Sequence, residues 1–194
     1  MSYSPNVRLI AEEHEPRPVS NGVLGMLLFV ITEIMFFAAM ISAFSIVRAS
    51  SAVWPPPDQP RLPFEATAFN SVVLLASGAL LIWTQRRFAE DRSSARVTLI
   101  ASILLGAFFV VFQGFEWVSM LAQGLTLTSS TLGSFFYLIV GMHGLHAIIA
   151  IAFLVRVWRK LEHGWLQPSQ LATAAVFWYF VVGAWPLIYW RVYL

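Results

Sequence analysis

Long apolar stretches, separated by short polar or proline-rich segments, dominate the chain. Each stretch reaches the roughly 20 residues that a helix needs to cross the hydrocarbon core of a bilayer. The pattern predicts five membrane-spanning helices at residues 21–47, 64–85, 97–121, 131–157 and 170–193. We therefore expect an all-α polytopic membrane protein folded as a five-helix bundle.

The breaks between these stretches are well marked. Prolines follow Trp54 and recur up to Pro63, where they prevent a helix from continuing because proline lacks the backbone N–H donor. Polar or charged loops are predicted at residues 86–96, 123–130 and 159–168. No internal repeat is visible, so the simplest division is a polar N-terminal segment at residues 1–20 and one membrane domain at residues 21–194.

Composition supports this class of protein and excludes several others. Hydrophobic residues make up 58% of the chain, charged residues make up 11%, and the mean hydropathy is +0.72. The sequence pI is about 9.3, but the net charge is only +2 and the basic residues lie in short loops, so we expect no nucleic-acid partner. The chain has no cysteine, which excludes disulfides and thiolate metal sites. No cleavable signal peptide is visible.

The basic residues predict the orientation in the membrane. Of the twelve basic residues, three arginines lie on one side of the predicted spans. The other nine lie on the side that contains the N-terminal segment: Arg8, Arg17, Arg86, Arg87, Arg92, Arg96, Arg156, Arg159 and Lys160. Since cytoplasmic loops carry the excess of Lys and Arg, the N-terminus is expected in the cytoplasm and the C-terminus outside.

Glu33 is the only charged residue between positions 23 and 47 and lies near the centre of the first span. A carboxylate at the bilayer midplane costs roughly 2.5–3.5 kcal/mol on insertion scales, so such a residue normally faces protein or water and marks a functional site. Two interpretations stay open. The acid handles protons or lipid, or it bonds a neighbouring helix and only helps assembly.

Other polar residues lie at a depth in the predicted spans similar to that of Glu33. At about 1.5 Å per residue, Glu33 lies about 18 Å from its end of the first span, and His143, His146 and Tyr179 fall in or near the same layer. Whether these side chains meet depends on helix rotation, which the sequence does not fix. Glu116 lies nearer the opposite surface, where we interpret it as an interfacial anchor. The alternative is a specific polar role, as part of a polar or lipid network with His143, His146 and Tyr179.

His143 and His146 share one helix face, which raises the question of a metal or haem. The other two histidines lie outside the spans, and a bis-histidine haem needs a ligand from each of two helices. We therefore favour packing and hydrogen bonding for this pair. No phosphate loop, activated nucleophile or metal cluster is present, so no catalytic site is expected on this chain.

Several segments resemble, in order, the signatures of subunit III of the haem-copper oxidases, the cytochrome c oxidase type. The first signature surrounds the buried acid in GMLLFVITEIMFF, and the last resembles the family's GxHGLH. The segments are Gly25–Phe37, Trp54–Pro56, Asn70–Gly78, Gln113–Trp117, Gly133–Tyr137 and Gly141–His146. The length is similar to that of short, five-helix bacterial forms.

The resemblance implies a non-catalytic subunit of an aerobic terminal oxidase in the inner (plasma) membrane. It implies haem and copper on partner subunits I and II, bound phospholipid in a cleft, and support for proton uptake. Cytochrome c or a cytochrome bc complex would be a partner in a larger assembly. Glu33 matches the family's membrane-embedded glutamate, and His143 and His146 match its histidine pair. We expect Glu33 to hold a proton in an environment shared with His146 or lipid.

The last span departs from the family pattern YWHFVDxVW. Tyr179 replaces the histidine, Val182 replaces the aspartate, and Pro186 is expected to kink the helix just beyond. These changes put in doubt any polar link between this helix and Glu33. Two alternatives therefore stay open: an accessory subunit of a nitric oxide reductase, and, from another class, a small proton-coupled transporter.

Overall fold

The computed structural model describes residues 20–54 and 60–194, and the described chain is helical, with no strand. All five predicted membrane spans are confirmed as helices long and apolar enough to cross a membrane. The N-terminal segment and the prolines directly after Trp54 lie outside the described residues. The helices are α1 (Asn21–Ser50), α2 (Phe64–Phe88), α3 (Arg92–Ala122), α4 (Thr131–Glu162) and α5 (Pro168–Ile188), followed by the short π-helix η1 (Tyr189–Tyr193).

The helices extend beyond the predicted apolar spans, so two predicted loops are wrong in extent. The charged loop expected at residues 86–96 shrinks to residues 89–91, and α4 continues to Glu162. Hydropathy detects the part of a helix that lies in hydrocarbon, whereas backbone hydrogen bonds continue where charged side chains are solvated. Asp91 begins α3 as its N-cap and accepts a hydrogen bond from the Ser93 amide at 2.9 Å.

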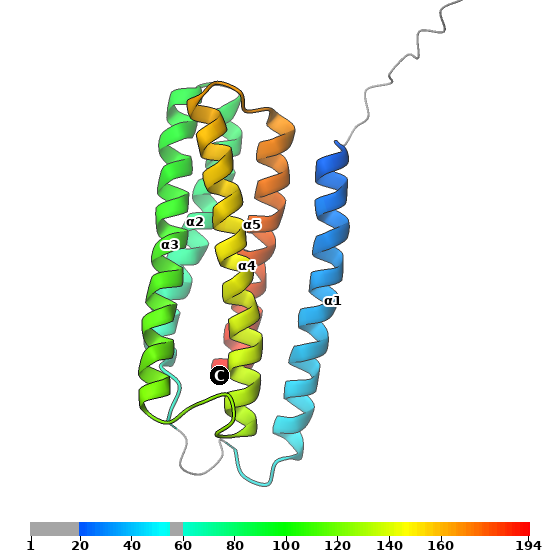
Figure 1. The fold of residues 1–194 in the computed structure, drawn as a ribbon, viewed down its shortest axis with the longest axis vertical. Coiled ribbons are helices and arrows are strands. Elements are labelled where there is room, and N and C mark those ends of the chain that lie inside the picture. The colour runs from blue at the N-terminus through cyan, green and yellow to red at the C-terminus, as the bar shows by residue number, and fades with distance from the viewer. Residues whose placement is uncertain (1–19, 55–59) are drawn as a thin grey trace, which may run out of the picture.

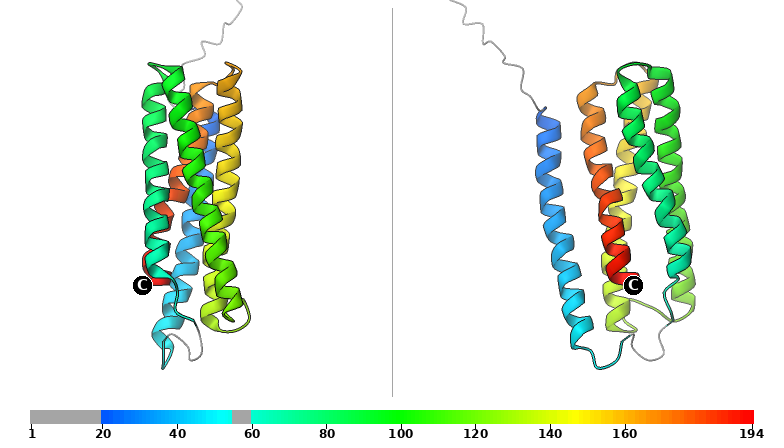
Figure 2. Two further views of the ribbon diagram at one scale, coloured as in Figure 1. Left: turned by 90° about the vertical axis from the view of Figure 1, so that its left-hand side faces the viewer. Right: turned by 180° about the vertical axis from the view of Figure 1, so that it is seen from behind.

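Helices α2 to α5 form a compact group, and α1 stands at one edge beside α5 and α4 (Figure 1, Figure 2). The C-terminus lies at the same end of the molecule as the α1–α2 and α3–α4 connections (Figure 1). Just beyond Pro186, where the sequence predicts a kink, α5 passes into the π-helix η1. Proline removes one helical hydrogen bond at that point.

A seam of polar contacts joins α2 to α3. The residues of α2 that form it are seven positions apart, so they lie on one face of the helix. Asn70 Nδ2 donates to the Phe109 carbonyl at 3.1 Å, the Ser77 hydroxyl donates to the Ser102 carbonyl at 2.8 Å, and the Thr84 hydroxyl lies 2.8 Å from the Thr98 hydroxyl. Such bonds fix helix register in a membrane, where burying apolar surface between helices gains little.

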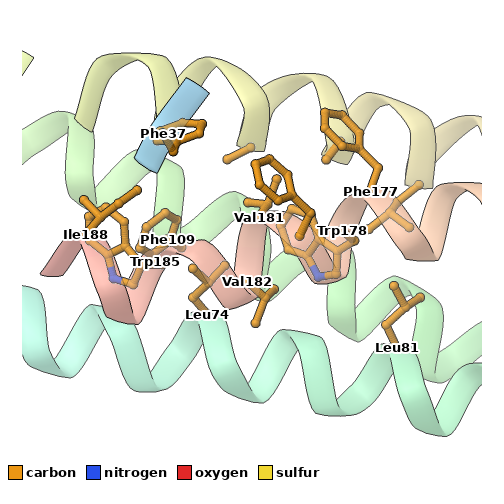
Figure 3. Packing of buried hydrophobic residues seen from close by; sticks show 14 of the residues in the cluster. Phe37, Leu74, Leu81, Phe109, Phe177, Trp178, Val181, Val182, Trp185 and Ile188 are labelled. Carbon is orange, nitrogen blue, oxygen red and sulfur yellow. The ribbon is translucent and has the colours of Figure 1, made fainter. Parts of the chain in front are cut away.

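Helix α5 provides the centre of the core. Figure 3 shows its side chains lying between α4 and α2. Trp178 and Trp185 are fully buried. Gly106 of α3 makes room for Trp178, because a Cβ atom there would lie 2.6 Å from the indole ring. The core is therefore tightly packed around α5.

Candidate functional site

The half-buried acid of α1, Glu33, contacts a histidine of α4. Glu33 Oε2 lies 3.0 Å from His146 Nε2, and His146 Nδ1 lies 2.7 Å from the Met142 carbonyl oxygen. A carbonyl only accepts hydrogen bonds, so Nδ1 carries a hydrogen. A hydrogen bond between Nε2 and Oε2 then requires one proton between them, either on the acid or on the imidazole. The pair has zero net charge in both forms, which suits a membrane interior.

Aromatic rings surround this pair. The ring of Phe37 lies 5.5 Å from that of His146, while the rings of Phe177 and Phe180 of α5 lie 6.0 Å and 6.1 Å from it. The side chain of His146 is 8% exposed and that of Glu33 is 18% exposed. The histidine is therefore enclosed, while the acid keeps limited access to the surface of the bundle.

His143 does not join this pair. It is buried, and neither ring nitrogen has a hydrogen-bond partner. Its ring lies against Trp185 at 4.9 Å and makes edge contacts with Phe109 and Phe37. Among the described residues, no group of three or more His, Cys, Asp or Glu side chains is placed to hold a metal.

Tyr179 bonds to a different helix from the one that carries Glu33. Its hydroxyl donates to Gln85 Oε1 of α2 at 2.5 Å. Val182 packs against Gly78, also on α2. Toward the Glu33–His146 pair, α5 presents the rings of Phe177 and Phe180.

Glu116, a candidate for an interfacial anchor or for a polar network, lies among polar side chains inside the bundle. Its side chain is buried, Oε2 lies 2.8 Å from the Thr67 hydroxyl oxygen, and Oε2 accepts a hydrogen bond from Gln113 Nε2 at 3.0 Å. Gln113 Nε2 also lies 3.0 Å from the Tyr193 hydroxyl. The rotation of α3 turns Glu116 inward, toward α2 and η1, which its depth alone did not reveal.

The family model for cytochrome c oxidase subunit III matches residues 9–194. The chain belongs to the cytochrome c oxidase subunit III family. Cytochrome c oxidase subunit 3 of Pelomedusa subrufa is 33% identical over 190 residues, which cover 93% of this chain and 72% of the relative. The Petromyzon marinus protein is 34% identical over 193 residues, with the same shares, and that of Prototheca wickerhamii is 35% identical over 175 residues, covering 86% and 66%.

The subunit III family supports the interpretation of this chain as a non-catalytic oxidase subunit. A subunit III associates with other oxidase subunits, such as subunit I, and this chain is a multi-pass membrane protein of that kind.

A second feature of this subunit III is a cavity where the first turns of α1 and α5 meet the end of α4. Its volume is about 340 Å³. Basic side chains, Arg156 and Lys160, contribute to the lining together with polar and apolar groups: Gln170, Thr173, Gly22, Met26, Phe153, Val157 and Ala174. A cavity with both cations and apolar walls suits an anionic amphiphile.

Sequence reasoning missed the aromatic residues around His146 and the partner of Tyr179. Nothing in the sequence distinguishes Phe37, Phe177 and Phe180, because phenylalanine is abundant in every span. Gln85 offered a signal, since it is a polar residue at the end of an apolar span. Depth places it on the same side of the membrane as Tyr179, so the contact was open to prediction.

Proposed function

We propose that the chain is subunit III of a bacterial aerobic terminal oxidase in the inner (plasma) membrane, where it stabilises subunit I, holds phospholipid and supports proton uptake. Haem and copper belong to subunits I and II in this proposal, with cytochrome c or a cytochrome bc complex as the electron source of the assembly. The Glu33–His146 contact inside a subunit III fold is the observation that carries the proposal.

The pair is suited to handling one proton without separating charge. The proton can reside on Oε2 of Glu33 or on Nε2 of His146, 3.0 Å away, and the net charge is zero either way. Aromatic rings exclude water from the histidine side, while the acid is partly exposed. This combination supports slow proton exchange with the surface of the bundle rather than a role in bond making.

The basic cavity supports the lipid part of the proposal. Arg156 and Lys160 lie one helical turn apart on α4 and supply positive charge at the predicted cytoplasmic end. Met26 and Phe153 supply the apolar wall beside them. An anionic phospholipid would place its phosphate near the cations and its acyl chains along the aromatic and aliphatic side chains.

Glu33→Gln tests the proton role in the purified oxidase complex. The amide keeps a hydrogen bond to His146 but cannot release a proton. We expect unchanged haem content and initial turnover, with altered proton uptake or faster loss of activity during turnover. Glu65→Gln, at an exposed acid in the first turn of α2, serves as the control. Complete loss of initial turnover in an intact complex would contradict the proposed role.

Arg156→Gln combined with Lys160→Gln tests lipid binding. We expect less anionic phospholipid in the purified complex, measured by mass spectrometry of the extracted lipid. Arg159→Gln removes a neighbouring charge that does not line the cavity and serves as the control. Equal lipid loss in both variants would rule out a specific site.

Affinity purification of the tagged chain tests the assignment as a whole. Haem bands in the optical spectrum, together with subunits I and II by mass spectrometry, are the expected result. A nitric oxide reductase partner would instead assign the chain to denitrification. A colourless solitary protein would favour the transporter alternative.

A further inference from the structure

A buried acid, Glu116, lies far from Glu33 along the chain and joins three elements. Glu116 of α3 contacts Thr67 of α2 and Gln113 of its own helix, and Gln113 in turn contacts Tyr193 of η1. Thr67 is fully buried, and the exposed fractions of Gln113, Glu116 and Tyr193 are all below one tenth. No part of the proposed role of Glu33 uses this cluster.

The two contacts of the Thr67 hydroxyl point to a proton on Glu116. The Thr67 hydroxyl oxygen lies 2.8 Å from Glu116 Oε2 and 2.9 Å from the Pro63 carbonyl oxygen. A hydroxyl has a single hydrogen, and the carbonyl can only accept. Both contacts are hydrogen bonds if Thr67 donates to Pro63 and Glu116 donates to Thr67. Glu116 is then a neutral carboxylic acid.

The charge balance leads to the same conclusion. Among the described residues, no Lys, Arg or His side chain forms an ion pair with Glu116. Its Oε1 atom and the Oε1 atom of Gln113 are buried without hydrogen-bond partners. An ionised carboxylate would be a buried charge with no cation and one unbonded oxygen, which is strongly unfavourable, whereas a neutral acid avoids the charge.

The cluster lies where the C-terminal π-helix meets the α2–α3 hairpin. Tyr189, at the start of η1, donates to the Phe64 carbonyl at 2.9 Å, and Tyr193, at its end, contacts Gln113 at 3.0 Å. We propose that Glu116 is a proton-binding site whose neutral carboxylic acid holds the C-terminal π-helix on the α2–α3 hairpin. The bound proton lets Thr67, Glu116, Gln113 and Tyr193 share one hydrogen-bonded network.

Infrared difference spectroscopy of the purified oxidase complex tests the protonation state directly. The spectrum of the wild type minus that of Glu116→Gln should contain the carbonyl stretching band of a protonated carboxylic acid. Loss of an ionised carboxylate band would overturn the proposal. Thr67→Val removes the hydrogen-bond acceptor and should shift the same acid band; an unmoved band would also overturn it. Glu33→Gln leaves this band in place, which separates this test from that of the proposed function.

Hydrogen exchange of the Tyr189–Tyr193 amides tests the role in holding the π-helix. In Glu116→Gln the new amide can donate to Thr67 as the neutral acid does, and Gln113 can turn its own amide so that its oxygen accepts from the new amide and from Tyr193. Glu116→Gln should therefore exchange at nearly the wild-type rate. Glu116→Ala should exchange at least about tenfold faster, since it leaves Thr67 and Gln113 without their partner. Glu65→Gln is the control, with no expected change. Equal acceleration by Gln and Ala would contradict the proposed donor role of the acid.

Discussion

Helices α1 and α5 are both apolar enough to cross a membrane, and α1 is the more apolar of the two, yet they occupy opposite environments. Each helix contains an apolar window of 18 residues. In that window, 22% of the residues of α1 are buried inside the protein, compared with 56% of the residues of α5. Helix α5 makes polar contacts with α2 through Tyr179 and Trp185. Within its apolar span, α1 makes a polar contact with the rest of the bundle through Glu33, which lies beside His146. Hydropathy therefore does not decide which helix is central, because lipid tails are as apolar as leucine.

The largest effect is expected at the centre of α5. Trp185 is fully buried, packs against Phe109 and donates from Nε1 to the Ser71 hydroxyl at 2.7 Å. Trp185→Ala should lower the free energy of unfolding by about 4 kcal/mol, because it creates a cavity and removes that bond. Detergent-induced unfolding followed by circular dichroism measures the change. Trp190→Ala, at a side chain that is 56% exposed, should have little effect.

The next largest effect is expected where α1 meets the bundle. Phe37 is buried against His146 and Phe180, whereas the neighbouring Phe36 is 42% exposed. Phe37→Ala should cost about 3 kcal/mol and loosen α1, seen as faster hydrogen exchange along that helix. Phe36→Ala is the matched control. Similar losses for the two variants would mean that α1 has no preferred inner face.

A smaller effect is expected from adding a single methyl group between α3 and α5. Gly106→Ala places a Cβ atom where the indole of Trp178 lies, so the expected destabilisation is about 2 kcal/mol by overpacking. Gly25→Ala on α1 meets nothing within 4 Å and should be neutral or slightly stabilising. Thermal unfolding of the two variants in one detergent compares them. If Gly106→Ala is also neutral, the core around α5 is looser than the structure indicates.

The smallest effect is expected at the turn between α2 and α3, outside both compared helices. A hydrogen bond from the Ser94 hydroxyl, with a further one from the Ser93 amide, holds the pKa of Asp91 below its ordinary value. The resulting stabilisation is present above the ordinary carboxyl pKa and is lost as the pH falls through the lowered value. Asp91→Asn should abolish this loss of stabilisation at low pH. The pH dependence of the Ser93 and Ser94 amide chemical shifts measures the change. A persisting pH dependence would assign it to another group.

Much of the fold was open to prediction. The five spans follow from apolar length, and the breaks follow from proline and charged residues, because the bilayer imposes the same requirement on every helix. Helix ends were less predictable. Residues such as Arg86 and Glu162 are polar, yet they remain helical because backbone bonding continues outside the hydrocarbon.

The candidate site was predictable in part. Depth placed Glu33 and His146 near one level, and the structure joins them at 3.0 Å. Tyr179 shares that general depth but turns toward Gln85, and Glu116 turns inward instead of toward the membrane surface. Residue spacing gives the height of a side chain, whereas the rotation of its helix decides which neighbour it meets.

By itself, the sequence determined that the chain is a five-span membrane protein with a buried acid, and its motifs indicated the subunit III family. Those properties depend on residue type and order along one axis, which the sequence contains. The tertiary structure decided that α5 is central, that Glu33 contacts His146, and that Glu116 is enclosed with Thr67 and Tyr193. These outcomes depend on how close helices approach and how they rotate, which small residues such as Gly106 and specific hydrogen bonds set collectively.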